Sequence, residues 1–473
     1  MILKRFYDEK LAQASYLVGC AATGEAVVID PSRDIAQYLD AAEKEGLRIV
    51  AVTETHIHAD YVSGSRELGK VTGATVYLSD EGDENWKYGY ANEPNVKLVT
   101  HGDKIVIGNV SLEVAHTPGH TPEHISFILR DHPVSDSPMA VFTGDFIFVG
   151  DVGRPDLLER AANFQGTMVA GAKTLFQSLR RTSEWPAHLL IWPAHGAGSA
   201  CGKSLGGVPV STIGYERSTN WALSRDEESK FVDEVLQGQP EPPAYFKHMK
   251  RINKVGPELI FGNPQPSKLD PSTITDLANA HVNLVDIRPQ SDSVRGFIPG
   301  SLLLGMAKAF PNWAGWLLDF EKPIYLIAEG EPEVREAVKD LHSVGLDNVA
   351  GWFDLDVFKK WTESGRELSA IPQATATEAL SECCDGSSTL LDVRGKVEHE
   401  SGNISGSVHL PLGEISSRLE ELDRDTPLCI HCQSGYRSNI ACGILLNAGF
   451  EKVKNVVGAY PALVAEDKQT AKV

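Results

Sequence analysis

The hydrophobic and polar positions of the first half of the chain alternate between short apolar runs and longer stretches of helical periodicity. Apolar runs of strand length cover residues 26–30, 49–53 and 139–143, and the helical pattern covers residues 35–45 and 161–179. Alternating strands and helices are typical of α/β domains, whose strand ends deliver side chains to a common site. The pattern therefore predicts an α/β fold with its chemistry in the loops after the strands.

Two proline-rich segments interrupt this pattern and mark a domain boundary. Prolines cluster at residues 239–243 and again at residues 263–271, and such segments are typical of linkers. A chain of 473 residues is also too long for one hydrophobic core. We expect a first domain over residues 1–245 and a linker over residues 246–270.

The rest of the chain contains an internal repeat. Two pairs of apolar strand segments match at offsets of 106 residues, counted from Asp286 to Asp392, and 104 residues, counted from Pro323 to Pro427: 283–288 with 389–394, and 323–328 with 427–432. A repeat of this length rarely arises by chance. We therefore expect two copies of one α/β unit, over residues 271–370 and 371–473.

The two copies differ in the loop that follows the second matching strand. In the C-terminal copy the loop reads Cys432-Gln-Ser-Gly-Tyr-Arg437 and leads into an apolar helix over residues 440–446. Backbone N–H groups and the positive end of the helix dipole favour a thiolate in this position, so Cys432 is the candidate nucleophile. The middle copy has neither thiol nor arginine at residues 328–333, which predicts a structural or substrate-shaping role.

Three other loop residues fit a sulfur-transfer role for Cys432. Ser434 and Gly435 permit a tight curl, and Arg437 would add positive charge where a persulfide, thiosulfate or sulfite lies. The C-x4-R spacing gives a smaller anion-binding loop than the C-x5-R spacing of phosphatases. Together with the segment 391–394, this loop resembles the rhodanese family of sulfurtransferases, in which the cysteine carries a persulfide between donor and acceptor.

The first domain carries metal-ligating side chains in loops after its strands. The motif His56-Ile-His58-Ala-Asp60-Tyr61 is followed along the chain by His120, Asp145 and His195. A binuclear zinc hydrolase needs a histidine where this chain has Tyr61, so we expect one metal ion rather than two. Two imidazoles and one carboxylate, from His56, His120 and Asp145, form the facial triad that suits non-haem Fe(II).

These segments, in this order, resemble the metallo-β-lactamase superfamily over residues 1–240. Within that superfamily, residues 150–156 and 117–122 are similar to those of the persulfide dioxygenases. Residues 193–217 extend the resemblance to bacterial enzymes that join a persulfide dioxygenase to two rhodanese repeats, the first of them degenerate. The resemblance implies a metallo-β-lactamase αββα sandwich followed by two rhodanese α/β domains with parallel sheets.

The resemblance also implies an activity and a cofactor. His56, His120 and Asp145 would hold one Fe(II) per chain, and four further residues would surround these ligands: His58, Asp60, Tyr61 and His195. The expected reaction uses O2 to oxidise the persulfide of a small thiol to sulfite and the parent thiol. The rhodanese domain would interconvert sulfite plus persulfide and thiosulfate.

Several residues near the expected iron site are candidates for handling the substrate. Cys201, six residues after His195, could hold or relay a sulfane sulfur, or could simply pack in its glycine-rich loop. Arg154 and Lys203 are candidates for binding the anionic thiol carrier. Glutathione, coenzyme A and bacillithiol all present anionic groups, so the sequence does not distinguish them.

Two alternative functions stay open. A zinc thioester hydrolase of the glyoxalase II type would need a ligand to replace the histidine absent at Tyr61. A sulfur-carrier or sulfide-sensor scaffold would use Cys432 as its only active group, and the intact triad in the first domain argues against it.

Composition limits the classes of binding partner and the cellular compartment that we expect for this protein. A net charge of −20, from 64 acidic and 44 basic side chains, argues against binding to nucleic acid or an anionic membrane. No segment approaches the roughly 20 apolar residues of a membrane span, and the N-terminus lacks the apolar region of a signal peptide. Seven cysteines without paired spacing fit reduced thiols. We expect a cytoplasmic protein, and the resemblance implies a homodimer or homotetramer.

Overall fold

The structure is a computed structural model that describes residues 1–160, 166–203, 205–278, 280 and 282–470. It divides into two compact units: Met1–Pro264 with His342–Gly345, and Gln265–Leu341 with Leu346–Val473. The first unit extends beyond residue 245, where we expected it to end. The predicted linker begins with a helix, α8 (Phe246–Val255), which buries Phe246, Met249 and Asn253 along one face. This apolar face explains why α8 packs as part of the first unit.

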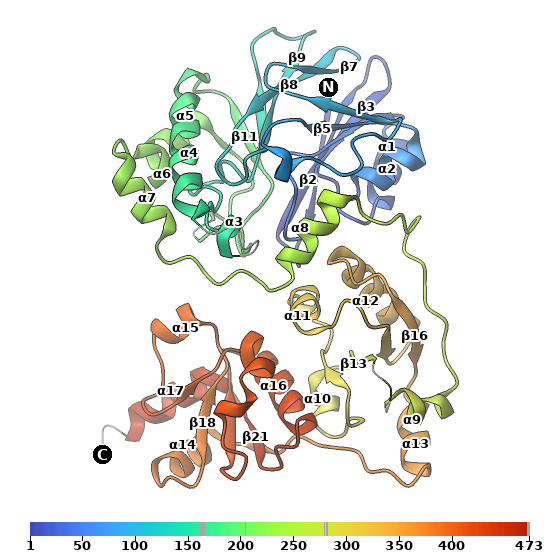
Figure 1. Cartoon of the computed structure of the whole chain (residues 1–473), viewed down its shortest axis with the longest axis vertical. Coiled ribbons are helices and arrows are strands. Elements are labelled where there is room, and N and C mark those ends of the chain that lie inside the picture. Colours follow the sequence, from blue (N-terminus) through green and yellow to red (C-terminus); the bar gives the residue numbers. More distant parts are fainter. Residues whose placement is uncertain (161–165, 204, 279, 281, 471–473) are drawn as a thin grey trace. The chain divides into compact units, whose positions relative to one another are not determined.

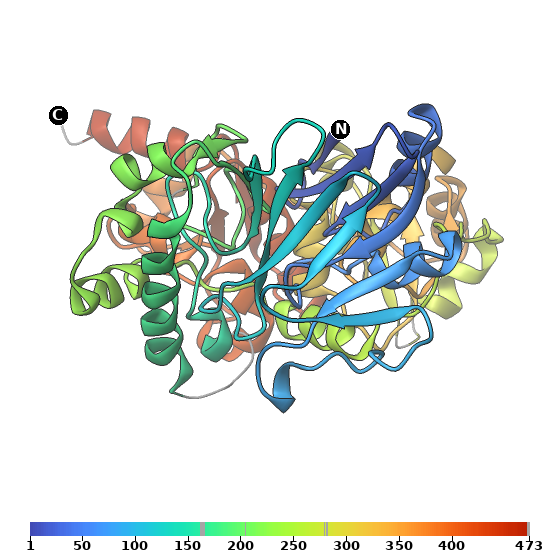
Figure 2. The same ribbon diagram turned by 90° about the horizontal axis from the view of Figure 1, so that it is seen from above.

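In the described part of the first unit, two six-stranded sheets pack between two groups of helices (Figure 1, Figure 2). The first sheet contains β1 (Ile2–Asp8), β2 (Gln13–Cys20), β3 (Glu25–Ile29), β4 (Arg48–Thr53), β5 (Thr75–Ser79) and β6 (Val96–Val99), in that order. The second contains β7 (Lys104–Ile107), β8 (Val110–His116), β9 (Ile125–Asp131), β10 (Ala140–Gly144), β11 (Leu190–Pro193) and β12 (Ser211–Thr212), in the order β12 to β7.

The apolar runs of the sequence are continuous because each sheet is buried on both faces. In β3, Val27 and Ile29 join the core between the two sheets, whereas Ala26 and Val28 join the core beneath α1 (Ala36–Lys44) and α2 (Ser65–Thr72). Successive side chains of a strand point to opposite faces, so one run serves two cores.

Helices cover the outer face of the second sheet in the same way. Apolar residues of four helices pack against its outward side chains: α4 (Thr167–Arg181), α5 (Ile213–Thr219), α6 (Trp221–Ser224) and α7 (Glu228–Leu236). The short helix α3 (Leu157–Arg160) precedes α4. The αββα sandwich is therefore confirmed. Of the helix predicted over residues 161–179, residues 161–165 lie outside the described part of the chain.

The second unit contains two parallel sheets with the same strand order. Among the described residues, the order β14-β13-β15-β16 of the middle repeat matches β19-β18-β20-β21 of the C-terminal repeat, which adds β17 at its edge. Their bounds are β13 (Asn283–Asp286), β14 (Leu302–Leu303), β15 (Ile324–Ile327), β16 (Val349–Phe353), β17 (Gln373–Ala374), β18 (Thr389–Asp392), β19 (Val408–His409), β20 (Leu428–His431) and β21 (Val453–Val456). This shared topology confirms the predicted duplication.

Helices connect these strands in both repeats. The middle repeat contains α9 (Ile274–Leu277), α10 (Gln290–Ser293), α11 (Phe310–Leu317), α12 (Glu331–Ser343) and α13 (Asp356–Glu363). The C-terminal repeat contains α14 (Ala376–Cys384), α15 (Lys396–Glu400), α16 (Tyr436–Asn447) and α17 (Ala459–Thr470). No helix among the described residues is long and apolar enough to span a membrane.

A buried ion pair recurs at the same place in the two repeats. Arg394 donates to Asp392 at 2.6 Å, and Arg288 donates to Asp286 at 2.6 Å. Each arginine also donates to a glycine carbonyl oxygen at 2.8 Å, so a further hydrogen bond supports each buried ion pair. The pair at the end of the strand thus belongs to the shared scaffold and not to the chemistry of one repeat.

Candidate metal centre and sulfur-transfer loop

The metal-ligand segments of the first unit follow the carboxyl ends of four strands. The four residues and the strands they follow are His56 after β4, His120 after β8, Asp145 after β10 and His195 after β11. The loop after β10 then folds back over Asp145: an added Cβ at Gly153 would lie 1.8 Å from the Asp145 carbonyl oxygen. Only glycine permits this close approach to the Asp145 backbone.

Three side chains form one compact group of donor atoms. The ligand atoms of His56, His120 and Asp145 all lie within 4.8 Å of one another, and all three residues are buried. The Asp145 Oδ2 atom is 3.5 Å from His120 Nε2 and 3.9 Å from His56 Nε2. Both Asp145 carboxylate oxygens lack a hydrogen-bond partner. Because a buried carboxylate without a partner is costly, this group fits a bound metal ion.

Contacts at Nδ1 orient the imidazole rings of His56 and His120, and burial keeps both rings neutral. The Nδ1 atom of His120 lies 3.1 Å from the carbonyl oxygen of Arg154, and that of His56 lies 2.9 Å from Thr55 Oγ1. These contacts leave each Nε2 atom directed at Asp145. Burial lowers the pKa of His120 to about 3 and that of His56 well below its usual value. Both rings therefore keep a lone pair for a metal.

His58 and Tyr61 both hydrogen-bond to Asp30, and the centroid of the His58 ring lies 4.2 Å from that of the His56 ring. His58 Nε2 is 3.1 Å from Asp30 Oδ1. Burial alone would lower the pKa of His58, but the Asp30 carboxylate more than offsets it and raises that pKa to about 9. The Tyr61 hydroxyl donates to the Asp30 carbonyl oxygen at 3.2 Å. The His58 Nδ1 atom has no hydrogen-bond partner among the described residues, but His58 is not among the three residues whose ligand atoms lie within 4.8 Å of one another, so that donor group has two imidazoles.

A second group of donor atoms lies beside the first. The ligand atoms of Asp60, His195 and Cys201 lie within 4.8 Å of one another, and all three residues are buried. His195 Nε2 is 3.2 Å from Asp60 Oδ2 and 3.4 Å from Asp145 Oδ1, so Asp145 faces both groups. Burial raises the pKa of the Cys201 thiol well above its usual value. Sequence reasoning brought Cys201 near the metal but missed that it completes a second donor set.

Asn253 on α8 holds the loop that carries these residues. Its side-chain amide donates to the carbonyl oxygens of His58 at 2.8 Å and Tyr61 at 2.7 Å, and it accepts from the Ser63 N–H at 2.9 Å. Sequence reasoning missed it because it lies in the predicted linker. A polar residue in register with Phe246 and Met249 on the apolar face of a helix was the available signal.

Arg154 and Lys203, which the sequence suggested as residues that bind the thiol carrier, both make contacts inside the first unit. Arg154 is fully buried and pairs with Asp156 at 2.8 Å, and its remaining donors bind carbonyl oxygens. Lys203 Nζ donates to the Glu234 carbonyl oxygen at 2.5 Å and lies over the Trp221 ring. Both cations therefore tie loops together inside the first unit.

Cys432 in the second unit lies at the predicted position, between β20 and α16. Its sulfur accepts a hydrogen bond from the Gly435 N–H at 3.1 Å and lies 3.6 Å from Ser438 Oγ. Gly435 has a φ of +101°, which the tight curl requires, and the Ser434 side chain is exposed. A cavity of about 380 Å³ lies beside the loop, lined in part by Glu398, Gln433 and Tyr460.

Arg437 is paired with a carboxylate. Its guanidinium donates to both oxygens of Glu398, at 2.5 and 2.7 Å. Sequence reasoning expected Arg437 to add positive charge where a sulfur anion lies. The guanidinium hydrogen-bonds to the Cys432 sulfur as well as to Glu398, which partly offsets its charge, and the Gly435 N–H is a further donor to the same sulfur.

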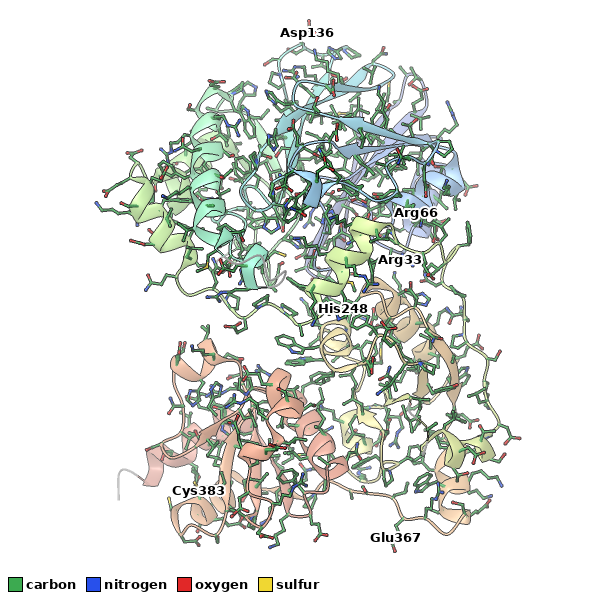
Figure 3. All side chains as sticks on the ribbon, in the orientation of Figure 1. Arg33, Arg66, Asp136, His248, Glu367 and Cys383 are labelled. Atoms are coloured by element: carbon green, nitrogen blue, oxygen red, sulfur yellow. The ribbon has the colours of Figure 1, made fainter. Side chains whose placement is uncertain are left out.

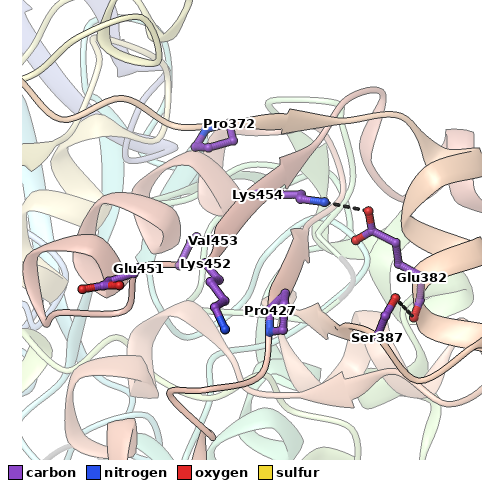
Figure 4. Close-up of a pocket in the computed structure, with 8 residues that line it drawn as sticks. All are labelled: Pro372, Glu382, Ser387, Pro427, Glu451, Lys452, Val453 and Lys454. Atoms are coloured by element: carbon purple, nitrogen blue, oxygen red, sulfur yellow. Dashed lines mark hydrogen bonds and ion pairs between the residues drawn. The ribbon is translucent and has the colours of Figure 1, made fainter.

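Another cavity of the C-terminal repeat is separate from this chemistry (Figure 4). Its lining includes Pro427 and Val453, which lie at the amino ends of β20 and β21, and a Lys454–Glu382 ion pair of 2.6 Å. Cys432 follows the carboxyl end of β20, where ligands of parallel sheets bind. Cys383, labelled in Figure 3, lies on α14, and its neighbour Cys384 is exposed.

Comparisons with known proteins agree with this architecture. The metallo-beta-lactamase superfamily matches residues 9–198, and the rhodanese-like domain matches residues 375–466. The crystal structure of a metallo-beta-lactamase from Staphylococcus aureus subsp. aureus COL is 41% identical, with a TM-score of 0.68, and covers 75% of this chain and 99% of that one. The chain therefore belongs to the metallo-beta-lactamase superfamily and carries a C-terminal rhodanese-like domain.

Two curated relatives differ in their activity. The mitochondrial persulfide dioxygenase ETHE1 of Bos taurus is 29% identical over 248 residues, which are 51% of this chain and 84% of that protein. The hydroxyacylglutathione hydrolase of Rhodospirillum rubrum is 33% identical over 181 residues, which are 38% of this chain and 60% of that protein. Homology to such relatives indicates that the chain is an enzyme with a non-haem metal site.

The role of Asn253 gives the first prediction. Asn253→Ala would leave two buried carbonyl oxygens and one buried N–H without partners, so we expect a loss of about 2–4 kcal/mol in the free energy of unfolding. We also expect less metal bound per chain, because the loop of His58, Asp60 and Tyr61 loosens. Thermal unfolding and elemental analysis measure both. The exposed Lys247→Ala on the same helix is the control, and equal metal content in the two variants would contradict the role.

Proposed function

We propose that the chain is a persulfide dioxygenase coupled to a sulfurtransferase. The proposed reaction is RSSH + O2 + H2O → RSH + SO3²⁻ + 2 H⁺, in which the sulfane sulfur is oxidised and O2 is reduced. The observation that supports it most is the buried group of two neutral imidazoles and one unpartnered carboxylate, His56, His120 and Asp145. This donor set suits Fe(II) and oxygen chemistry.

Iron(II) held by these three residues would supply the redox chemistry between O2 and sulfur. The protein's own residues would exclude water and hold the sulfur. The buried setting of the donor group excludes bulk water, which protects a persulfide from side reactions. Cys201, whose thiol lies beside Asp60 and His195, is placed to accept or deliver a sulfane sulfur next to the donor group.

The proposed substrate is the persulfide of a small anionic thiol of the glutathione, coenzyme A or bacillithiol kind. The relative from Bos taurus, named a persulfide dioxygenase, supports this substrate class. Because Arg154 and Lys203 are committed to internal contacts, the anionic part of the carrier must be recognised by other groups.

We further propose that Cys432 makes thiosulfate from the sulfite product. Sulfite would attack the outer sulfur of a Cys432 persulfide, the S–S bond would break, and the Cys432 thiolate would leave. The Gly435 N–H at 3.1 Å stabilises that thiolate. Placing both activities in one chain raises the local concentration of the shared intermediate.

A second candidate function is a two-metal thioester hydrolase. The donor set of Asp60, His195 and Cys201, with Asp145 facing both groups, favours it, and so does the relative named hydroxyacylglutathione hydrolase. Against it, His58 pairs with Asp30 through Nε2 and does not belong to the compact donor group of His56, His120 and Asp145. Oxygen consumption separates the two functions, because thioester hydrolysis uses no O2.

The dioxygenase proposal predicts stoichiometric oxygen uptake. Protein purified without oxygen and loaded with iron should consume one O2 for each sulfite formed from glutathione persulfide, as the balanced reaction requires. An oxygen electrode and sulfite analysis measure the ratio. Hydrolysis of S-lactoylglutathione by zinc-loaded protein, with no oxygen uptake by iron-loaded protein, would replace this proposal with the hydrolase.

If the two activities are coupled but reside in separate sites, thiosulfate formation can be abolished without loss of oxygen uptake. Cys432→Ser should leave oxygen uptake from free persulfide largely intact and abolish thiosulfate formation, so that sulfite accumulates. Cys384→Ser, an exposed thiol in the same repeat, is the matched control and should behave like the wild type. Product analysis by chromatography distinguishes sulfite from thiosulfate. If oxygen uptake collapses with Cys432→Ser, the two sites are not independent.

A further inference from the structure

One face of helix α16 is turned toward the middle repeat. The residues on this face are Tyr436, Asn439, Gly443 and Asn447, which recur at helical spacing. The Asn447 amide donates to the Ser301 carbonyl oxygen at 2.8 Å, and Leu303 lies 3.0 Å from where a Cβ of Gly443 would be. Both groups belong to the segment 286–305 of the middle repeat, so this segment packs along the helix that begins beside Cys432.

Two of these contacts lie on the first turn of α16. The Gln290 side-chain amide donates to the Tyr436 carbonyl oxygen at 2.9 Å. The Tyr436 hydroxyl donates to the Gly305 carbonyl oxygen at 2.8 Å. The first turn is also where the N–H groups of a helix have no partner within the helix and are free to bind an anion.

A hydrogen bond to the Tyr436 carbonyl oxygen also restrains the orientation of the Arg437 N–H, because both groups belong to one peptide unit. The peptide bond between Tyr436 and Arg437 is planar, so the carbonyl oxygen and the Arg437 N–H point in opposite directions along one rigid unit. Gln290 therefore adds, from outside the C-terminal repeat, a hydrogen bond that restrains a peptide unit already held by the first turn of α16. The Arg437 guanidinium hydrogen-bonds to both Glu398 and the Cys432 sulfur, and the Gly435 N–H also donates to that sulfur, so the orientation of residue 437 bears directly on the nucleophile.

We propose that Gln290 of the middle repeat is a positioning residue for the Cys432 loop, acting through the peptide bond between Tyr436 and Arg437. The middle repeat then serves the sulfurtransferase although it has Ala328 where its partner repeat has Cys432. The corresponding residue of the C-terminal repeat, at the offset of 106, is Lys396, which faces Glu400 and makes no such contact. The duplicated scaffold has thus diverged at this position. The effect on turnover rests on the proposed sulfurtransferase function.

The test compares Gln290→Ala with the exposed Ser291→Ala on the same helix. We expect Gln290→Ala to slow alkylation of Cys432 by iodoacetamide about fivefold, the factor that one neutral hydrogen bond is worth, and to raise the KM for thiosulfate by a similar factor. Mass spectrometry of the Cys432 peptide measures alkylation, and sulfur transfer from thiosulfate to cyanide measures KM. The melting temperature should fall by no more than a few degrees, the shift expected for one lost hydrogen bond, and Ser291→Ala should match the wild type.

Tyr436→Phe, which removes only the bond to Gly305, provides a second variant that keeps the packing of the helix. It should slow alkylation less than Gln290→Ala does. Alkylation and KM equal to the wild type in Gln290→Ala would overturn the proposal, as would equal changes in Ser291→Ala. If the wild type transfers no sulfur, the sulfurtransferase function fails, and the alkylation rates still decide whether Gln290 positions the loop.

Discussion

The first unit is organised around Asp145, a buried carboxylate that no nitrogen or oxygen donor in the described part of the chain satisfies. Burial raises its pKa to about 6, although His195 and the Cys201 thiol act in the opposite direction. A desolvated carboxylate is stabilised either by a proton or by a cation. Neutral imidazoles on one side, from His56 and His120, leave a metal ion as the partner that satisfies all three groups.

The fold around Asp145 supports this arrangement at several levels. Strands buried on both faces place four loops at one edge of the sandwich, and Gly153 lets the loop after β10 cover Asp145. Asn253 ties the loop of His58 and Tyr61 to α8 with three hydrogen bonds. The geometry of the metal group therefore depends on segments far from it in the sequence.

Much of this could be predicted from the sequence, and the exceptions have physical reasons. Continuous apolar runs such as residues 26–30 located the strands, and the loops after them gave His56, His120 and Asp145. A pattern of residue types does not show what each charge is paired with, so the pairing of Arg154 with Asp156 and of Arg437 with Glu398 was missed.

The sequence also did not predict which side chains surround Cys201. Its sequence distance from His195 suggested proximity, but only the folded loop shows that it joins Asp60 and His195 as a donor set. The sequence did not identify Asn253 as a functional residue, because its hydrogen-bond partners are backbone atoms nearly two hundred residues away in the chain. Contacts of this kind depend on tertiary packing and leave no periodic signal in the sequence.

The two repeats of the second unit show how one scaffold serves two roles. The strand order and the buried pairs Asp286–Arg288 and Asp392–Arg394 are shared, whereas the thiol occurs only in the C-terminal copy. The middle copy contributes contacts along α16, which begins at the nucleophile loop. A repeat without a thiol of its own thus contributes structural contacts to the repeat that has one.

The central claim is that a single metal ion lies among His56, His120 and Asp145. X-ray absorption spectroscopy of iron-loaded protein, combined with elemental analysis, tests it most directly. The account predicts one iron per chain with a nitrogen and oxygen coordination shell and no metal–metal scattering. Two ions per chain, with a metal–metal distance in the spectrum and a sulfur ligand from Cys201, would contradict it.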